Sequence, residues 1–234
     1  MLTATESGRR PKVGPPLPPI AIATVALFMA SLILPTVLAK GATFPSPYGD
    51  ADIVVGYFQN NPTPVLITAL LQFAASIPLV IFTATASVRL NHLGVRVPGP
   101  TIGLVGGILS AALLQMSALL TWTLTRPEIL EHAELIRVLH DLAFITGGPG
   151  FIVPSGLLIA GIAVPGLIAG LLPRWLAWAG LVIAGLAMIA LLAIAFPALS
   201  ILLPIVRLPT LAWLVITAFQ LPSKRNSVAR KDTP

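Results

Sequence analysis

The sequence predicts an all-α membrane protein, a bundle of six transmembrane helices with both termini in the cytoplasm. Of its 234 residues, 56% are hydrophobic and only 9% are charged, whereas a soluble domain carries about 25% charged residues. Mean hydropathy is +0.94. The apolar residues gather in stretches of about 20, the length that a helix needs to cross a bilayer. Together these observations exclude a soluble enzyme, a coiled coil and a disordered protein.

The membrane domain is expected at residues 19–221, between a polar, Pro-rich tail (1–18) and a basic tail (222–234). Its first apolar stretch is longer than the apolar core of a signal peptide, which has 7–15 residues, so we expect an uncleaved anchor. The fourth apolar region is the hardest to divide, and five or seven helices are the alternatives to six. The spans are expected at about 19–39, 64–87, 101–125, 136–164, 175–195 and 199–221.

Helix-breaking residues occur at two places, one within a span and one between two spans. Gly147, Gly148, Pro149 and Gly150 fall inside the fourth span, and Phe196-Pro197 separates the fifth from the sixth. Proline donates no backbone hydrogen bond, and glycine is entropically costly in a helix. Non-helical backbone at membrane depth needs cover from protein or from a wet cavity, and broken helices mark binding sites in transporters. The break at 147–150 therefore predicts either a site or a plain kink. The stretch 165–174 is expected to be a short turn.

The basic residues favour an orientation with both termini inside, which requires an even number of spans. With the N-terminus inside, ten basic residues lie in cytoplasmic segments and three lie outside. The ten are Arg9, Arg10, Lys12, Arg89, Arg96, Arg174, Lys224, Arg225, Arg230 and Lys231, and the three are Lys40, Arg126 and Arg137.

Composition also excludes several kinds of chemistry. The chain has no cysteine and only three histidines, none in a zinc-binding pattern, so we expect no metal, no cofactor and no catalytic residue. The net charge of +6 lies in tails and loops, which indicates membrane lipids as partners rather than nucleic acid. Arginine outnumbers lysine, and Ala, Gly and Pro are abundant, which indicates a bacterial protein of the cytoplasmic (inner) membrane.

Ionisable residues within the spans are the main candidates for a site, because burying one in hydrocarbon costs about 2.5–3.5 kcal/mol on insertion scales. Arg207 and Asp141 lie at similar depths in the outer half, which predicts an ion pair, with Glu134 as the competing partner. The predicted polar layer of the outer half contains Gln72, Gln115, His140, Asp141 and Arg207. It forms either a binding cavity or a set of interhelical hydrogen bonds.

Small residues recur at four-residue spacing, as in Gly103-x-x-x-Gly107, Gly106-x-x-x-Ser110, Gly156-x-x-x-Ala160 and Gly166-x-x-x-Gly170. Such pairs let helices approach closely, and we expect mainly packing within the chain. Residues 41–61 are expected to form an outer loop, in which Asp50 and Asp52 are a weak cation signal.

Two segments carry a resemblance to a known family. They are Leu139-His140-Asp141 with Gly147-Gly148, and Leu172-Pro173-Arg174-Trp175-Leu176-Ala177-Trp178-Ala179-Gly180. Over about residues 20–221 the chain resembles the DUF4386 family of bacterial six-span membrane proteins. The resemblance implies the fold and the membrane location. It carries over no activity and no functional residue.

From the residues themselves we expect a non-enzymatic membrane module. It would bind a lipid, a small amphiphile or a membrane protein partner around Arg207, Asp141 and Gln115. The alternative is a small secondary transporter, proton-coupled through Asp141. An intramembrane enzyme using His140 ranks last, because no complete acid–base or metal set accompanies it.

Overall fold

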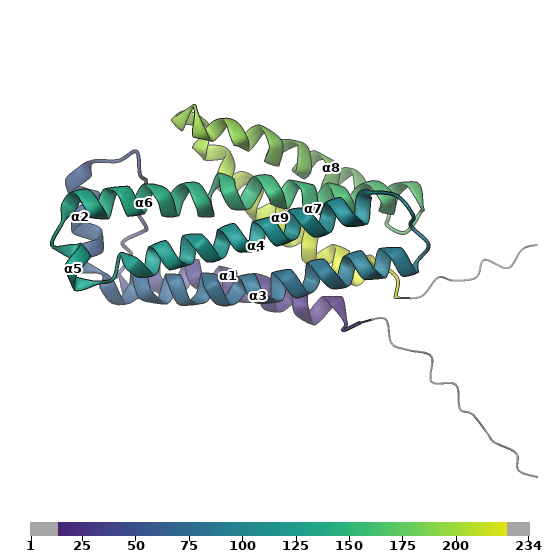
Figure 1. The fold of residues 1–234 in the computed structure, drawn as a ribbon, viewed down its shortest axis with the longest axis horizontal. Helices are drawn as coiled ribbons and strands as arrows, with labels where there is room; N and C mark the ends of the chain where they lie inside the picture. The colour runs from purple at the N-terminus through teal and green to yellow at the C-terminus, as the bar shows by residue number, and fades with distance from the viewer. Residues whose placement is uncertain (1–13, 224–234) are drawn as a thin grey trace, which may run out of the picture.

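The computed structural model describes residues 14–223, and this part of the chain is entirely helical, without strands (Figure 1). Six helical units are long and apolar enough to cross a membrane, which makes the chain a multi-pass membrane protein. They are α1 (Leu17–Leu38), α3 (Pro62–His92), α4 (Gly99–Thr123), α6 (Ala133–Gly147) with α7 (Pro149–Ile168), α8 (Arg174–Ile189) with the 3₁₀-helix η1 (Ala190–Ile194), and the 3₁₀-helix η2 (Pro197–Ile201) with α9 (Leu202–Gln220). The predicted six-helix fold is thus confirmed.

Two short helices lie between the spans: α2 (Ala51–Asn60) and α5 (Pro127–Leu130). The prediction of a loop over residues 41–61 was wrong for its second half. Asp50 caps α2, because its side chain accepts a hydrogen bond from the backbone N–H of Asp52 at 2.8 Å. A side-chain oxygen at this position satisfies a free donor of the first helical turn. Asp50 therefore has a structural role in starting α2.

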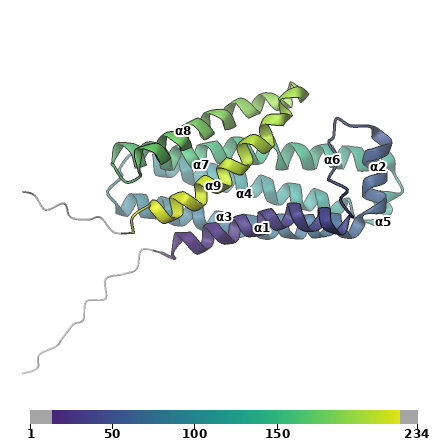
Figure 2. The same cartoon turned by 180° about the vertical axis from the view of Figure 1, so that it is seen from behind.

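The bundle is centred on α4, which packs between α3 and α7, while α1 lies along α3 (Figure 1). Helices α8 and α9 form a hairpin that leans away from the other helices at the η1–η2 turn (Figure 2). The extended backbone of Phe196 joins η1 to η2, as predicted for the Phe196-Pro197 hinge. At the other end of the hairpin, the indole N–H of the buried Trp213 donates to the carbonyl of Leu176 at 2.8 Å.

Small residues bring the central helices into close contact. A Cβ added to Gly106 would lie 2.6 Å from the carbonyl oxygen of Pro154, and one added to Gly156 would lie 2.8 Å from the Cβ of Ala187. Gly107 likewise leaves no room for a side chain beside Thr83. The predicted small-residue pairs therefore serve packing within the chain. Gly170 is different, because it has a positive φ of 63° in the turn after α7 and so occupies the left-handed position that often ends a helix.

The expected turn at 165–174 is shorter than predicted, because α7 continues through Pro165 to Ile168. Both ends of the described chain lie at the same end of the bundle, where Arg89 joins them. This side chain is only 6% exposed. Its guanidinium donates to the carbonyls of Leu221 at 3.5 Å and Pro15 at 3.4 Å. The arrangement agrees with an even number of spans. The basic residues that the sequence analysis assigned to the two tails lie outside the described residues.

Candidate functional site

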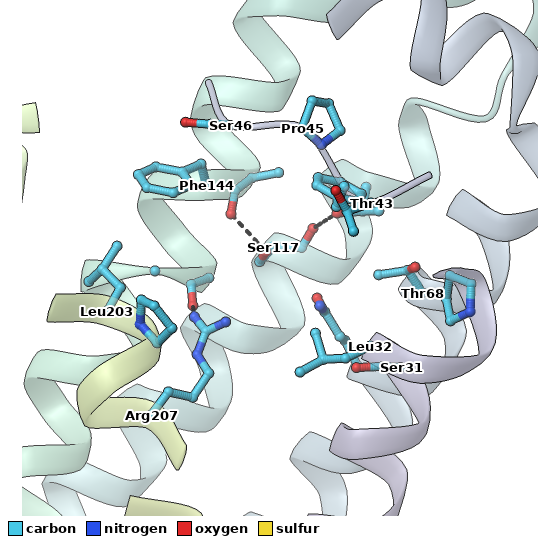
Figure 3. Close-up of a pocket in the computed structure, with 18 of the residues that line it drawn as sticks. Ser31, Leu32, Thr43, Pro45, Ser46, Thr68, Ser117, Phe144, Leu203 and Arg207 are labelled. Atoms are coloured by element: carbon cyan, nitrogen blue, oxygen red, sulfur yellow. Dashed lines mark hydrogen bonds between the residues drawn. The ribbon is translucent and has the colours of Figure 1, made fainter. Parts of the chain in front are cut away.

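A cavity of about 640 Å³ lies in the half of the bundle away from the described chain ends. Figure 3 shows residues that line it. Ligand pockets commonly enclose about 300–1,000 Å³. The lining mixes apolar groups with hydroxyls and one amide, that of Gln72. The walls are formed by residues of α1 (Ser31, Leu32, Pro35, Thr36), α3 (Thr68, Gln72), α4 (Leu114, Ser117, Thr121), α6 with the break (Ala143, Phe144, Gly147, Gly148) and η2–α9 (Ser200, Ile201, Leu203, Pro204, Arg207, Leu208). Residues 43–46 and Tyr57 line the end of the cavity that faces away from the chain ends.

Arg207 is the one charged residue that lines this cavity within residues 14–223. Its Nη2 donates a hydrogen bond to the carbonyl oxygen of Gly147. Its Nε is buried and has no partner in the described part of the chain. The other terminal nitrogen of the guanidinium points into the cavity (Figure 3). An arginine carries five N–H donors, so Arg207 keeps unused hydrogen-bonding capacity directed at the empty space.

Two aromatic rings contact the guanidinium of Arg207. Phe28 of α1 and Phe151 of α7 stack with ring centroids 5.8 Å apart, and both rings are almost fully buried. The guanidinium carbon of Arg207 lies 5.4 Å from the Phe28 centroid and 5.6 Å from the Phe151 centroid. Such cation–π contacts lie within the usual limit of about 6 Å. They stabilise the charge without neutralising it, because a ring carries no net negative charge.

The helix break provides the carbonyl that Arg207 uses. Helix α6 ends at Gly147, and α7 begins at Pro149, which has no N–H to donate. The last carbonyls of a helix lack intrahelical partners, and the Gly147 carbonyl accepts from Arg207. Glycine is required here sterically as well. A Cβ on Gly148 would lie 2.6 Å from the Phe144 carbonyl oxygen and 3.2 Å from a methyl group of Leu203.

Residues 43–46 cover the cavity on the side opposite Arg207 (Figure 3). Phe44 anchors this cover, since its ring lies 5.7 Å from Tyr57, 5.3 Å from Phe58 and 5.6 Å from His140. Burial raises the pKa of the Tyr57 phenol above its ordinary value of 10.0, because desolvation disfavours the anion. The cover is therefore an aromatic cluster that joins the loop to α2 and α6.

The structure places the predicted site residues unequally. Arg207, Gln72, Gly147 and Gly148 line the cavity, whereas Pro149 and Gly150 belong to the break without lining it. His140 is buried in the aromatic cover. Gln115 is half-buried on α4 outside the lining, and Asp141 is exposed.

The predicted ion pair between Arg207 and Asp141 is not formed. Within residues 14–223 the salt bridge present is that of Arg126 with Glu128, at 3.6 Å, and the competing partner Glu134 is exposed too. The reason is the helical rotation of about 100° per residue, which follows from 3.6 residues per turn. The buried face of α6 carries His140 and Ala143, so Asp141 points outward. Arg207 also meets α6 at its end, at Gly147, six residues further along the helix than Asp141.

Sequence reasoning missed two parts of the site: the hydroxyl residues of the lining and the stacked rings of Phe28 and Phe151, which we call the aromatic floor. Ser31, Thr68, Ser117 and Thr121 bond mostly to helix carbonyls, as in the 2.8 Å bond from Ser117 Oγ to the Ala143 carbonyl. Such residues are common in membrane helices, so their types alone carry no signal. Phe28 and Phe151 lie far apart in the chain, and no spacing pattern links them.

Among the residues described, no three His, Cys, Asp or Glu side chains come together to hold a metal ion. Comparison of the chain with protein-family models, curated proteins and solved structures gives no match. The resemblance to the DUF4386 family therefore stays a prediction.

Proposed function

We propose that this protein is a non-enzymatic membrane protein that binds a lipid or small amphiphile with an anionic group, and that Arg207 pairs with that group. The observation that carries the proposal is a guanidinium facing a cavity of about 640 Å³ without an acidic partner among the described residues. A charge at membrane depth is costly unless it is paired or reaches water. A bound anion would supply the missing charge.

The chemistry of the lining supports this class of ligand. Arginine binds carboxylate and phosphate groups through two parallel N–H donors. The hydroxyl of Ser200 and the amide of Gln72 offer further polar contacts, while Leu32, Leu203 and Leu208 supply apolar surface. A pocket that is mostly apolar with a few convergent polar groups suits a molecule with a charged head and a hydrocarbon part.

The competing hypothesis of proton-coupled transport depended on Asp141. That carboxylate is exposed and does not line the cavity, so the geometry favours binding over transport. We place the protein in the bacterial cytoplasmic membrane, on the compositional grounds given above and with the N-in, C-in orientation. In that orientation the cavity lies in the outer half of the membrane.

Native mass spectrometry after mild detergent extraction tests the proposal. The wild-type protein is expected to carry a small bound mass, and Arg207→Ala is expected to lose it. A hydrogen bond to a charged group contributes about 1.5–3 kcal/mol, so affinity should fall by about tenfold or more. Arg137→Ala is the matched control, because Arg137 is an exposed arginine of α6 outside the cavity.

Two results would contradict the proposal. One is a bare polypeptide for both the wild type and Arg207→Ala. The other is an identical bound mass in both. If a second protein is released together with the wild-type chain but not with Arg207→Ala, the chain is instead an accessory subunit that binds this partner through Arg207.

A further inference from the structure

We infer that the cavity is filled sideways from the membrane, through the space between α1 and α9, so that its ligand is a membrane lipid rather than a water-soluble anion. The inference rests on the proposed function and deepens it, because it identifies where the ligand comes from. It follows from which sides of the cavity are closed and which is open.

The end of the cavity that faces away from the chain termini is covered by the segment before α2, in which Phe44 and Tyr48 are themselves 39% and 48% exposed. Residues 43–46 lie across it (Figure 3), and two aromatic contacts hold them in place. Phe44 packs between Phe58 and His140, and Tyr48 meets Phe144 edge-on, with ring centroids 5.7 Å apart. A soluble anion arriving from this side would have to displace that aromatic cluster.

At the opposite end, the guanidinium of Arg207 lies against the stacked rings of Phe28 and Phe151. The stacked rings of Phe28 and Phe151 are 1% and 2% exposed. Leu114 is buried beside them in the same hydrophobic core. A polar ligand that came from the side of the chain ends would have to cross this buried apolar layer, which disfavours the access from both faces of the membrane that a transporter requires.

The third side differs, because α1 and α9 do not stay together along their length. They lie close near the chain ends and separate toward the cavity (Figure 2). The residues on the two edges of this opening are apolar and face outward. Leu32 of α1 is 37% exposed, and on the other edge Ile201 and Leu208 are 63% and 50% exposed.

The opening is apolar at its rim and charged in its interior, which matches the acyl chain and the head group of a lipid. The charged guanidinium of Arg207 lies inside, beside the Gly147 carbonyl, while the apolar side chains of Leu32, Ile201 and Leu208 are exposed at the rim. A head group held at Arg207 could thus leave its hydrocarbon chain between α1 and α9, in contact with the surrounding lipid. A free phosphate or a short carboxylate would gain nothing from an apolar rim.

Photolabelling of the full-length protein in vesicles tests this route. The probe is phosphatidylglycerol with a photoreactive acyl chain, added to one leaflet at a time, and labelled peptides are identified by mass spectrometry. Because the chain contains no cysteine, the paired substitution Leu32→Cys with Leu208→Cys gives two unique thiols. A bifunctional thiol reagent then bridges the opening before the probe is added.

The matched control pair is Ile22→Cys with Phe219→Cys, two exposed positions toward the end of the bundle where α1 and α9 stay close. Bridging Leu32→Cys to Leu208→Cys should reduce labelling to the level of Arg207→Ala, whereas bridging the control pair should leave it unchanged. A second variant, Leu32→Trp with Leu208→Trp, fills the opening without cross-linking and should slow labelling in the same way.

The outcomes separate the two proposals. Absence of Arg207-dependent labelling in the wild type would contradict the proposed function itself. Labelling that depends on Arg207 but is unaffected by either blocked variant would contradict the sideways route and leave the proposed function standing. Arg207-dependent labelling that persists after the opening is bridged, and that inorganic phosphate or octanoate in water displaces, would identify a soluble anion as the ligand.

Discussion

Arg207 donates a hydrogen bond to the carbonyl oxygen of Gly147, sixty residues earlier in the chain. This bond joins two features that stand apart in the sequence, the break between α6 and α7 and the arginine within α9. Broken helices in membranes leave carbonyls that need a donor, and a buried guanidinium needs acceptors. Each feature satisfies part of what the other lacks, and the second terminal nitrogen of Arg207 faces the cavity.

Replacing Arg207 with methionine should separate ligand binding from stability. The variant should lose the bound small mass, while its thermal stability in detergent without ligand should stay within about 2 kcal/mol of the wild type, because removing a buried charge offsets the lost hydrogen bond and ring contacts. Thermal unfolding of delipidated protein measures this. A variant that no longer folds would show that Arg207 is primarily a packing residue.

Gly148→Ala should destabilise the protein by about 1–3 kcal/mol, the usual cost of overpacking. The added Cβ would meet the Phe144 carbonyl oxygen at 2.6 Å, and a backbone atom cannot move aside as a side chain can. Gly185→Ala is the control in α8, where nothing lies within 4 Å of the added Cβ. Its expected effect is neutral or stabilising by up to about 1 kcal/mol. Equal effects of the two substitutions on the melting temperature would refute this account.

Phe28→Ala should cost about 3–5 kcal/mol and also weaken ligand binding, because it leaves a gap beneath Arg207 and removes one of its two ring contacts. Phe219→Ala removes a ring that is 63% exposed and should change stability by no more than about 0.5 kcal/mol. Thermal unfolding of both variants, together with native mass spectrometry, provides the comparison. Loss of stability with unchanged binding would show that the floor does not position Arg207.

Alkaline pH should loosen the aromatic cover through Tyr57. Burial raises the pKa of this phenol in the folded protein, so the folded state favours the neutral form. The resulting stability is fully present below the ordinary value of 10.0 and is lost as pH rises through the higher folded pKa. As pH rises above 10.0, the unfolding temperature of the wild type should therefore fall more than the unfolding temperature of Tyr57→Phe.

The Tyr48→Phe variant allows the titration of Tyr57 to be followed by phenolate absorption, because Tyr57 is then the only tyrosine of the chain. Its phenolate absorption should appear above the ordinary pKa, and denaturation should return the titration to that value. A titration at the ordinary value in folded Tyr48→Phe protein would contradict the burial of the Tyr57 phenol.

The sequence by itself determined the six spans and the helix breaks. Apolar stretches of bilayer length permit little besides helices, since every backbone group in hydrocarbon must be bonded internally. Pro149 and the neighbouring glycines break the fourth span, and Pro197 separates the fifth from the sixth, because their backbone chemistry is local. Depth is also a local property, which is why Arg207 and Gln72 could be assigned to one layer and do line one cavity.

Only the tertiary structure decided which side chains in that layer meet. Depth along a helix does not fix the direction in which a residue points, and Asp141 faces outward while its neighbour His140 is buried. The partners of Arg207 come from three other elements: Phe28 on α1, Gly147 at the end of α6 and Phe151 on α7. Their meeting depends on how the helices pack, and packing depends on residues distributed along the whole chain, such as Gly106 against Pro154.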